Sequence, residues 1–221
     1  YTLYSMENNQ VALSQAEVDK LLGLSSGDRS DSVVKKEKKS YKVKEFLTPE
    51  QLEEVREVCK SVYKHFKLDL RGKFGEPKIR KLTISSLEQI NINEFFDTIT
   101  DNDFLYEVSF GELKAFIKLD SFLFGALSGM NIDTKHKINF FQSEVLKEFV
   151  VNFLAGSFAR QFSDKFEPVV TSLFEKDKKT FRTGKTGLNI TINWNENLRS
   201  FGIEKVFLTQ EAVESFRVLS K

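Results

Sequence analysis

The stretch at residues 187–195, "GLNITINWN", decides the fold class that the sequence predicts. Its apolar residues alternate with polar ones, which is the two-residue period of a strand that buries only one of its faces. The four apolar positions are Leu188, Ile190, Ile192 and Trp194. Because antiparallel sheets commonly bury one face and leave the other polar, this alternation predicts an antiparallel sheet with helices packed on its apolar side.

Two halves of the chain repeat one plan around this strand. "AFIKLDSFLFGAL" (residues 115–127) and "KVFLTQEAVESFRVL" (residues 205–219) each read as a strand followed by a helix, with Asp120 and Thr209 at the helix N-cap. A long helix precedes the strands in each half, from Thr48 and from about residue 140 to 166. The pattern predicts an α/β (α+β) domain over residues 46–221 with pseudo-twofold symmetry, in which long helices pack on a mostly antiparallel sheet.

The segment "LSQAEVDKLL" at residues 13–22 has the signature of a short amphipathic helix. Ser14 and Glu17 have capping-box spacing, and Leu13 and Val18 are placed as a hydrophobic staple around that cap. Isolated helices shorter than about 12–15 residues are marginal in water. We therefore expect this segment to fold only on the surface of a partner.

A polar stretch separates this peptide from the domain. Residues 23–45 are rich in Ser, Asp and Lys, and their low hydrophobicity predicts a disordered linker. The predicted organisation is thus an N-terminal peptide at residues 1–22, a linker at residues 23–45 and a folded domain at residues 46–221.

Composition argues against several classes of function. The chain has 33 basic and 32 acidic residues, a balance that does not favour binding to nucleic acid or to an anionic membrane. Cys59 is the single cysteine, which rules out an internal disulfide. His65 and His136 lack partners at ligand spacing, so we expect no metal and no cofactor. No apolar run is long enough to insert into a bilayer, and the sequence predicts a cytoplasmic protein.

Glu148 and Asn152 form the one pair with catalytic potential. At i and i+4 of a helix, a carboxylate and a carboxamide project the same way, and such a pair could bind a lysine and orient a water at a phosphoaspartate. The alternative is an ordinary polar helix face.

The N-terminal segment resembles the peptide with which the flagellar motor switch protein FliM, and its relative FliY, bind the phosphorylated response regulator CheY. Residues 77–99 and 116–129 resemble the FliM middle domain in element order and local sequence. The resemblance implies the fold of the CheC and CheX phosphatases, and "NFLAGS" from Asn152 is similar to their catalytic helix. The implied CheY-binding residues are Leu13, Ser14, Gln15, Glu17, Val18, Asp19, Leu21 and Leu22.

The same resemblance implies a contact with the rotor protein FliG. FliM carries a Gly-Gly-x-Gly loop after its first half, and the corresponding residues here are Ser128, Gly129, Met130 and Asn131, which keep a single glycine. Met130 either faces a partner or folds back onto the core. FliN-type proteins and neighbouring copies in a ring are the other implied partners.

The implied function is therefore that of a non-enzymatic component of the motor switch, located in the cytoplasm at the flagellar basal body. A stand-alone adaptor and a phosphatase of phosphorylated CheY remain as alternatives. In the phosphatases Glu and Asn lie three positions apart, whereas Glu148 and Asn152 lie four apart. The sequence lacks a FliN-like C-terminal domain, so we expect either a fragment or a shortened paralogue.

Overall fold

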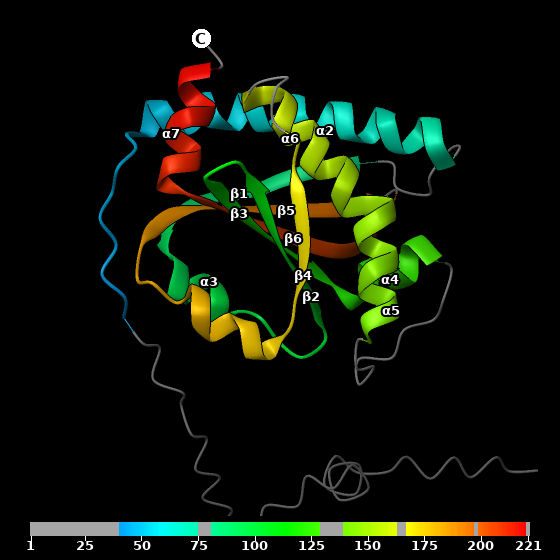
Figure 1. Ribbon diagram of the computed structural model, residues 1–221. Coiled ribbons are helices and arrows are strands. Elements are labelled where there is room, and N and C mark those ends of the chain that lie inside the picture. The colour runs from blue at the N-terminus through cyan, green and yellow to red at the C-terminus, as the bar shows by residue number, and fades with distance from the viewer. Residues whose placement is uncertain (1–39, 75–80, 129–138, 163–166, 197–198, 220–221) are drawn as a thin grey trace, which may run out of the picture. The chain divides into compact units, whose positions relative to one another are not determined.

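An antiparallel sheet of six strands lies at the centre of the described part of the domain (Figure 1). The computed structural model describes residues 40–74, 81–128, 139–162, 167–196 and 199–219. The strand order is β1-β5-β6-β3-β2-β4, and every neighbouring pair is antiparallel. The strands are β1 (Lys81–Asn91), β2 (Asp103–Phe110), β3 (Leu113–Asp120), β4 (Val169–Leu173), β5 (Thr186–Glu196) and β6 (Arg199–Thr209).

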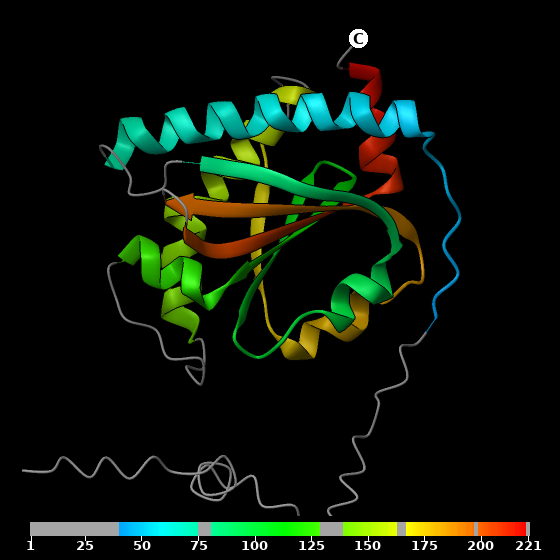
Figure 2. The same cartoon turned by 180° about the vertical axis from the view of Figure 1, so that it is seen from behind.

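Helices cover the two faces of the sheet unequally (Figures 1 and 2). The large core lies on the face covered by α2 (Pro49–Phe74), α6 (Asn152–Phe162) and α7 (Gln210–Leu219). The other face carries a smaller cluster under α3 (Ile92–Asp97) and the 3₁₀ helix η2 (Glu175–Phe181). Two further helices, α4 (Ser121–Ser128) and α5 (Phe140–Leu146), complete the described elements together with the π turn η1 (Lys147–Val151).

The predicted pseudo-twofold plan is confirmed by the sheet topology. The strands β1, β2 and β3 of the first half correspond to β4, β5 and β6 of the second. Exchanging each strand for its counterpart gives the same strand order, read from the opposite edge of the sheet. The two predicted caps are present: Asp120 Oδ1 accepts from the Leu123 N–H at 3.0 Å, and Thr209 Oγ1 accepts from the Ala212 N–H at 3.3 Å. The sequence offset between these caps also relates Ile117 to Val206, which pair directly across β3 and β6. The symmetry axis therefore passes through that pair.

The long helix predicted at residues 140–166 is not a single α-helix. It begins as α5, passes through the π turn η1 and continues as α6, which ends at Phe162. The Asn152 N–H donates to the Lys147 carbonyl, five residues back, in place of the usual four. Regular apolar spacing in the sequence did not reveal this extra residue.

The alternating strand that predicted the sheet fills the centre of the large core. Leu188, Ile190, Ile192 and Trp194 are all buried on the face towards α2. The Trp194 ring packs edge-on against Phe66 of α2, with ring centroids 5.7 Å apart. This contact joins the middle of the sheet to the longest helix.

A buried carboxylate lies beside these rings. Glu204 of β6 is fully buried, and its oxygens accept from the Tyr63 hydroxyl at 2.7 Å and the Trp194 Nε1–H at 2.8 Å. Burial raises the pKa of Glu204 to about 7, although the two hydrogen bonds act in the opposite direction. One ionisable group thus connects α2, β5 and β6 inside the core.

Among the described residues, no helix is both long enough and apolar enough to cross a membrane.

The buried Glu204 makes stability depend on pH. The pKa of a Glu side chain in the unfolded state is about 4.3. Between that pH and the folded-state pKa of about 7, the folded protein therefore binds more protons than the unfolded protein. The stabilisation is complete below the unfolded pKa and is lost as the pH rises to the folded pKa. We expect the wild type to lose up to about 3 kcal/mol of unfolding free energy, relative to Glu204→Gln, between about pH 5 and about pH 8.

Urea unfolding of both proteins across this pH range measures the difference. The exposed Glu54→Gln is the matched control and should follow the wild type at every pH. Parallel pH profiles for the wild type and Glu204→Gln would show that Glu204 does not titrate in this range.

Candidate functional site

The structure describes only part of the predicted site residues. Ser128 is the last residue of α4, and Gly129, Met130 and Asn131 lie outside the described residues. The predicted CheY-binding residues also lie outside them, namely Leu13, Ser14, Gln15, Glu17, Val18, Asp19, Leu21 and Leu22. Glu148 and Asn152 are described, and they lie at the π turn between α5 and α6.

Glu148 and Asn152 are in direct contact. The Asn152 Nδ2–H donates to Glu148 Oε2 at 3.2 Å, and the Glu148 side chain is exposed. Asn152 is its one hydrogen-bonding partner among the described residues. The pair therefore presents an accessible carboxylate next to an oriented amide on the outer surface of the helix.

The π turn changes how these two residues are related. It takes up one residue more than an α turn, so four positions across it correspond more closely to three positions of a regular α-helix. Glu148 and Asn152 are one residue further apart in the sequence than the corresponding pair of the phosphatases, and the π turn that accommodates one additional residue lies between them. π turns of this kind are frequent at functional sites.

A second carboxylate on the same helix is engaged in structural contacts. Glu144 forms an ion pair with Lys147 and accepts from the Ser172 hydroxyl of β4 at 2.7 Å. Its hydrogen bonds with Lys147 and Ser172 lower the pKa of Glu144. Glu144 therefore joins the helix to the edge strand, whereas Glu148 faces solvent.

An exposed aromatic patch, formed by Phe140, Phe141 and Phe174, lies near the start of the same helix. The exposed fractions of Phe140 and Phe141 are 65% and 74%, and Phe140 stacks on Phe174 with centroids 6.1 Å apart. A capping box between Asn139 and Gln142 fixes the helix start immediately before the two phenylalanines. Sequence reasoning missed this patch, because apolar residues at a helix start are normally expected to be buried.

The end of the predicted linker is attached to the domain, in a segment that we call the strap (residues 40–47; blue in Figure 1). The Tyr41 hydroxyl donates to Asp97 of α3 at 2.5 Å. The backbone N–H groups of Phe46 and Leu47 donate to Gln89 Oε1 at 2.8 and 2.9 Å, and Gln89 Nε2 donates back to the Leu47 carbonyl at 3.0 Å. Tyr41, which the sequence assigned to the linker, thus contacts the domain in the described part of the chain.

Polar contacts hold most of the strap, and only its last two residues reach the large core, where Leu47 is a member of the core cluster and Phe46 packs against it. Its residues from 42 to 45 are exposed, and Leu47 is buried. Asp97, which holds Tyr41, also forms an ion pair with Arg182 at 2.7 Å. The hydrogen bonds of Tyr41 and Lys44 are exposed, and those with Gln89 are only partly buried. Such bonds contribute modestly to stability, so the strap can open locally while the sheet stays folded.

Metal chemistry has no candidate site in the described ranges, where no group of three or more His, Cys, Asp or Glu side chains converges.

No protein-family model and no curated protein matches this sequence. Solved structures do match. The FliM middle domain from H. pylori aligns with a TM-score of 0.58 at 10% identity, covering 78% of this chain and 99% of that one. The domain has the fold of the FliM middle domain.

Two further structures share this fold. FliY from Thermotoga maritima aligns with a TM-score of 0.61 at 13% identity, covering 80% of this chain and 98% of that one. A chain of the FliG–FliM complex from H. pylori aligns with a TM-score of 0.59 at 12% identity, covering 79% of this chain and 100% of that one. The predicted resemblance to FliM and FliY is thereby confirmed at the level of the fold.

The strap should detach when its central contact is removed. Gln89→Ala eliminates all three hydrogen bonds with Phe46 and Leu47. We expect faster hydrogen exchange across residues 40–47 and little change at β5, because the strap opens locally without unfolding of the sheet.

Hydrogen exchange followed by mass spectrometry measures this effect. Gln51→Ala is the control, since the hydrogen bonds of Gln51 form a capping box with Thr48, the residue after the strap. Unchanged exchange in Gln89→Ala would mean that other contacts hold the segment.

Proposed function

We propose that this protein is a component of the flagellar motor switch that binds phosphorylated CheY through its N-terminal peptide and FliG through its FliM-like domain. One coincidence carries the proposal: a peptide resembling the CheY-binding segment of FliM precedes a domain with the FliM middle-domain fold. The FliM of the matched H. pylori structure was solved in complex with FliG, which supports FliG as the partner of this domain. The role is structural and regulatory rather than enzymatic.

The proposed mechanism depends on the linker. Residues 23–39 connect the peptide to the strap in the sequence, and their composition predicts a disordered linker. A linker of this length would keep a bound regulator at high effective concentration near the domain. The peptide must order when it docks, which typically costs 2–5 kcal/mol or more and favours modest affinity. Modest affinity suits a switch that has to release its signal quickly.

In this proposal the domain is one unit of a ring at the cytoplasmic end of the basal body. Neighbouring copies and FliN-type proteins would contact its remaining surfaces. The aromatic patch of Phe140, Phe141 and Phe174 is a surface available for such contacts, because large exposed apolar groups commonly mark interaction sites.

Val18 should be essential for capture of the regulator. It belongs to the predicted apolar face of the peptide together with Leu21 and Leu22. Val18→Asp places a charge in that face, and we expect at least about tenfold weaker binding of phosphorylated CheY, corresponding to about 1.4 kcal/mol.

Fluorescence anisotropy with labelled, phosphorylated CheY provides the measurement. Lys20→Ala, on the other side of the predicted helix, is the control and should bind as the wild type does. If Val18→Asp also bound as the wild type does, the peptide would not be the docking site.

A second candidate function is dephosphorylation of CheY. The π turn favours it, because this turn sets Glu148 and Asn152 closer to the arrangement expected from the phosphatase spacing. In this mechanism Glu148 binds a lysine of the regulator, and the Asn152 amide orients the water that attacks the phosphoaspartate. Both groups are on one exposed surface, as such a reaction requires.

For this second function, substoichiometric protein should accelerate the loss of phosphate from CheY. Asn152→Ala should slow the accelerated reaction by about 10²-fold or more, since it removes the group that positions the water. Phosphate release under single-turnover conditions is the measurement, with Gln161→Ala of the same helix as the control. Failure of the wild type to accelerate the reaction would exclude the phosphatase and leave the switch component.

A further inference from the structure

Two lysines face each other in the middle of the sheet. Lys118 of β3 and Lys205 of β6 lie directly opposite each other in the β3–β6 ladder. Their pair is next to the Ile117–Val206 pair, through which the symmetry axis passes. They lie on the face that also carries Phe116 and Phe207, two residues of the smaller core cluster. Like charges directly opposite each other in a sheet are destabilising.

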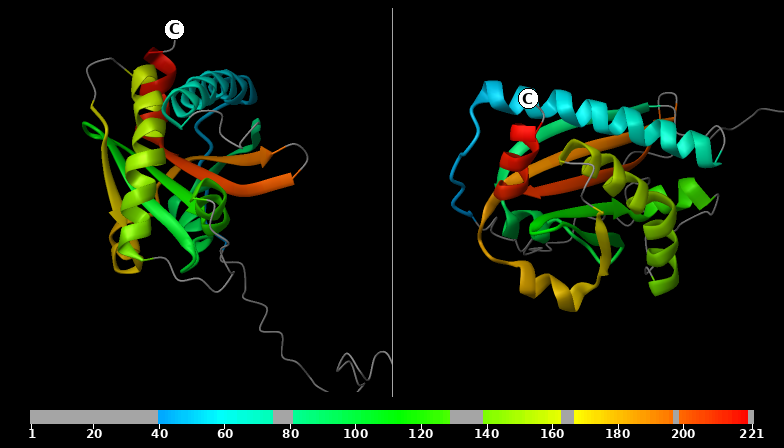
Figure 3. Two further views of the ribbon diagram at one scale, coloured as in Figure 1. Left: turned by 90° about the vertical axis from the view of Figure 1, so that its right-hand side faces the viewer. Right: turned by 45° about the horizontal axis from the view of Figure 1, so that its top comes forward.

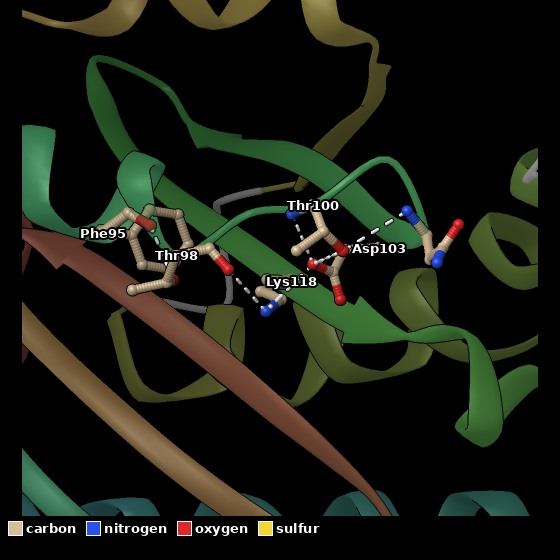
Figure 4. Close-up of polar contacts among 6 residues, drawn as sticks. Phe95, Thr98, Thr100, Asp103 and Lys118 are labelled. Atoms are coloured by element: carbon tan, nitrogen blue, oxygen red, sulfur yellow. Dashed lines mark hydrogen bonds and ion pairs between the residues drawn. The ribbon is translucent and has the colours of Figure 1, made fainter. Parts of the chain in front are cut away.

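Lys118 is held by the chain itself (Figure 4). Its ammonium forms an ion pair with Asp103 at 3.1 Å and donates to the Thr98 carbonyl at 3.0 Å. Asp103 is fixed in turn by the Thr100 N–H and hydroxyl, at 2.7 and 2.8 Å. The side chains of Lys118 and Asp103 are only 13% and 7% exposed, so this ammonium is held in a partly dehydrated ion pair.

Lys205 has no comparable contacts. It is half-buried, and its amine forms no hydrogen bond or ion pair with the residues that the structure describes. Burial, followed by the Lys118 charge, lowers the pKa of Lys205. Glu88 of β1, Asp103 of β2 and Glu94 of α3 act in the opposite direction and only partly compensate. Lys205 therefore has a larger share of neutral amine than an exposed lysine at the same pH.

We propose that Lys205 is a site of covalent acylation by small acyl phosphates. The lone pair of the neutral Nζ attacks the carbonyl carbon of the acyl phosphate. The carbon–oxygen bond to phosphate then breaks, phosphate leaves with the bonding electron pair, and the proton lost from Nζ goes to solvent. The products are an amide on Lys205 and inorganic phosphate, with no oxidation or reduction.

The surroundings favour both the reagent and the product. The Lys118 ammonium lies directly opposite Lys205 and, in this proposal, contacts the phosphate group of the acyl donor, in a site where the carboxylates of Glu88, Glu94 and Asp103 also act on Lys205. A neutral acyl donor has no group for this contact. The amide is uncharged, so acylation removes the repulsion between the two lysines and the cost of half-burying an ammonium. An exposed lysine gains neither advantage.

Acetyl phosphate is the probe for this reaction. The full-length protein is incubated with it at about pH 8, in native buffer and in urea, and initial acetylation rates at each lysine are measured by mass spectrometry. The native-to-denatured rate ratio corrects for local sequence. We expect this ratio to exceed one at Lys205 and to lie near one at the exposed Lys44 and Lys64. A ratio of one or less at Lys205 would overturn the proposal.

Lys118→Met tests the cause of the reactivity. Removing the neighbouring cation should lower the ratio at Lys205, whereas Lys114→Met, on the same strand and paired with Glu107, should not. Circular dichroism establishes whether each variant is folded. If a variant does not fold, the native-to-denatured ratio at Lys205 of the wild type still decides whether the proposal holds. An unchanged ratio in folded Lys118→Met would contradict the assigned role of Lys118.

Discussion

The hydrogen bonds of the buried Glu204 carboxylate hold the architecture together. Tyr63 of α2 and Trp194 of β5 donate to its two oxygens, so one group on β6 fixes the longest helix against the centre of the sheet. Losing either donor would leave a carboxylate oxygen unpaired in a core with no access to water, which is far more costly than losing an exposed hydrogen bond. The packing of α2 on this sheet therefore has to place the Tyr63 hydroxyl within hydrogen-bonding distance of Glu204.

The same interaction breaks the pseudo-twofold symmetry of the domain. Under the correspondence that relates Asp120 to Thr209, the position equivalent to Glu204 is Ala115, a buried apolar residue. Both halves supply a long helix, but only one helix supplies a tyrosine at this carboxylate. A polar contact present in one half alone specifies which helix occupies which site, as buried polar groups do in some helical assemblies.

Sequence patterns predicted the parts of the fold that depend on local chemistry. Alternation identified β5, and the caps at Thr48, Asp120 and Thr209 marked real helix starts because each satisfies orphan amides within a few residues. The π turn at residues 147–151 was not predictable, since its apolar residues fit a regular α-helix equally well. Glu204 was missed because a charged residue in a strand normally faces solvent. The strap was missed because side chains distant in sequence hold it.

In the candidate site, too, the sequence predicted what depends on residue spacing and did not predict what depends on the backbone arrangement. The pairing of Glu148 with Asn152 followed from their spacing, whereas their arrangement depends on a backbone hydrogen bond that no side-chain pattern encodes. The exposed Phe140 and Phe141 follow a capping box that fixes their helix start, and only the structure showed their exposure. The strap, finally, follows directly on the predicted linker in the sequence. The proposed function assigns CheY to the N-terminal peptide and FliG to the domain, which makes them separate sites on one chain.

That separation is the central claim of the functional account, and a mixture of three proteins tests it directly. The full-length chain, FliG and phosphorylated CheY are combined and analysed by size-exclusion chromatography with light scattering. Two sites joined by a linker predict a ternary complex containing all three proteins, in which CheY binds equally well with and without FliG. Displacement of FliG by CheY would mean that the two partners compete for one surface, and failure of FliG to bind would remove this protein from the motor switch.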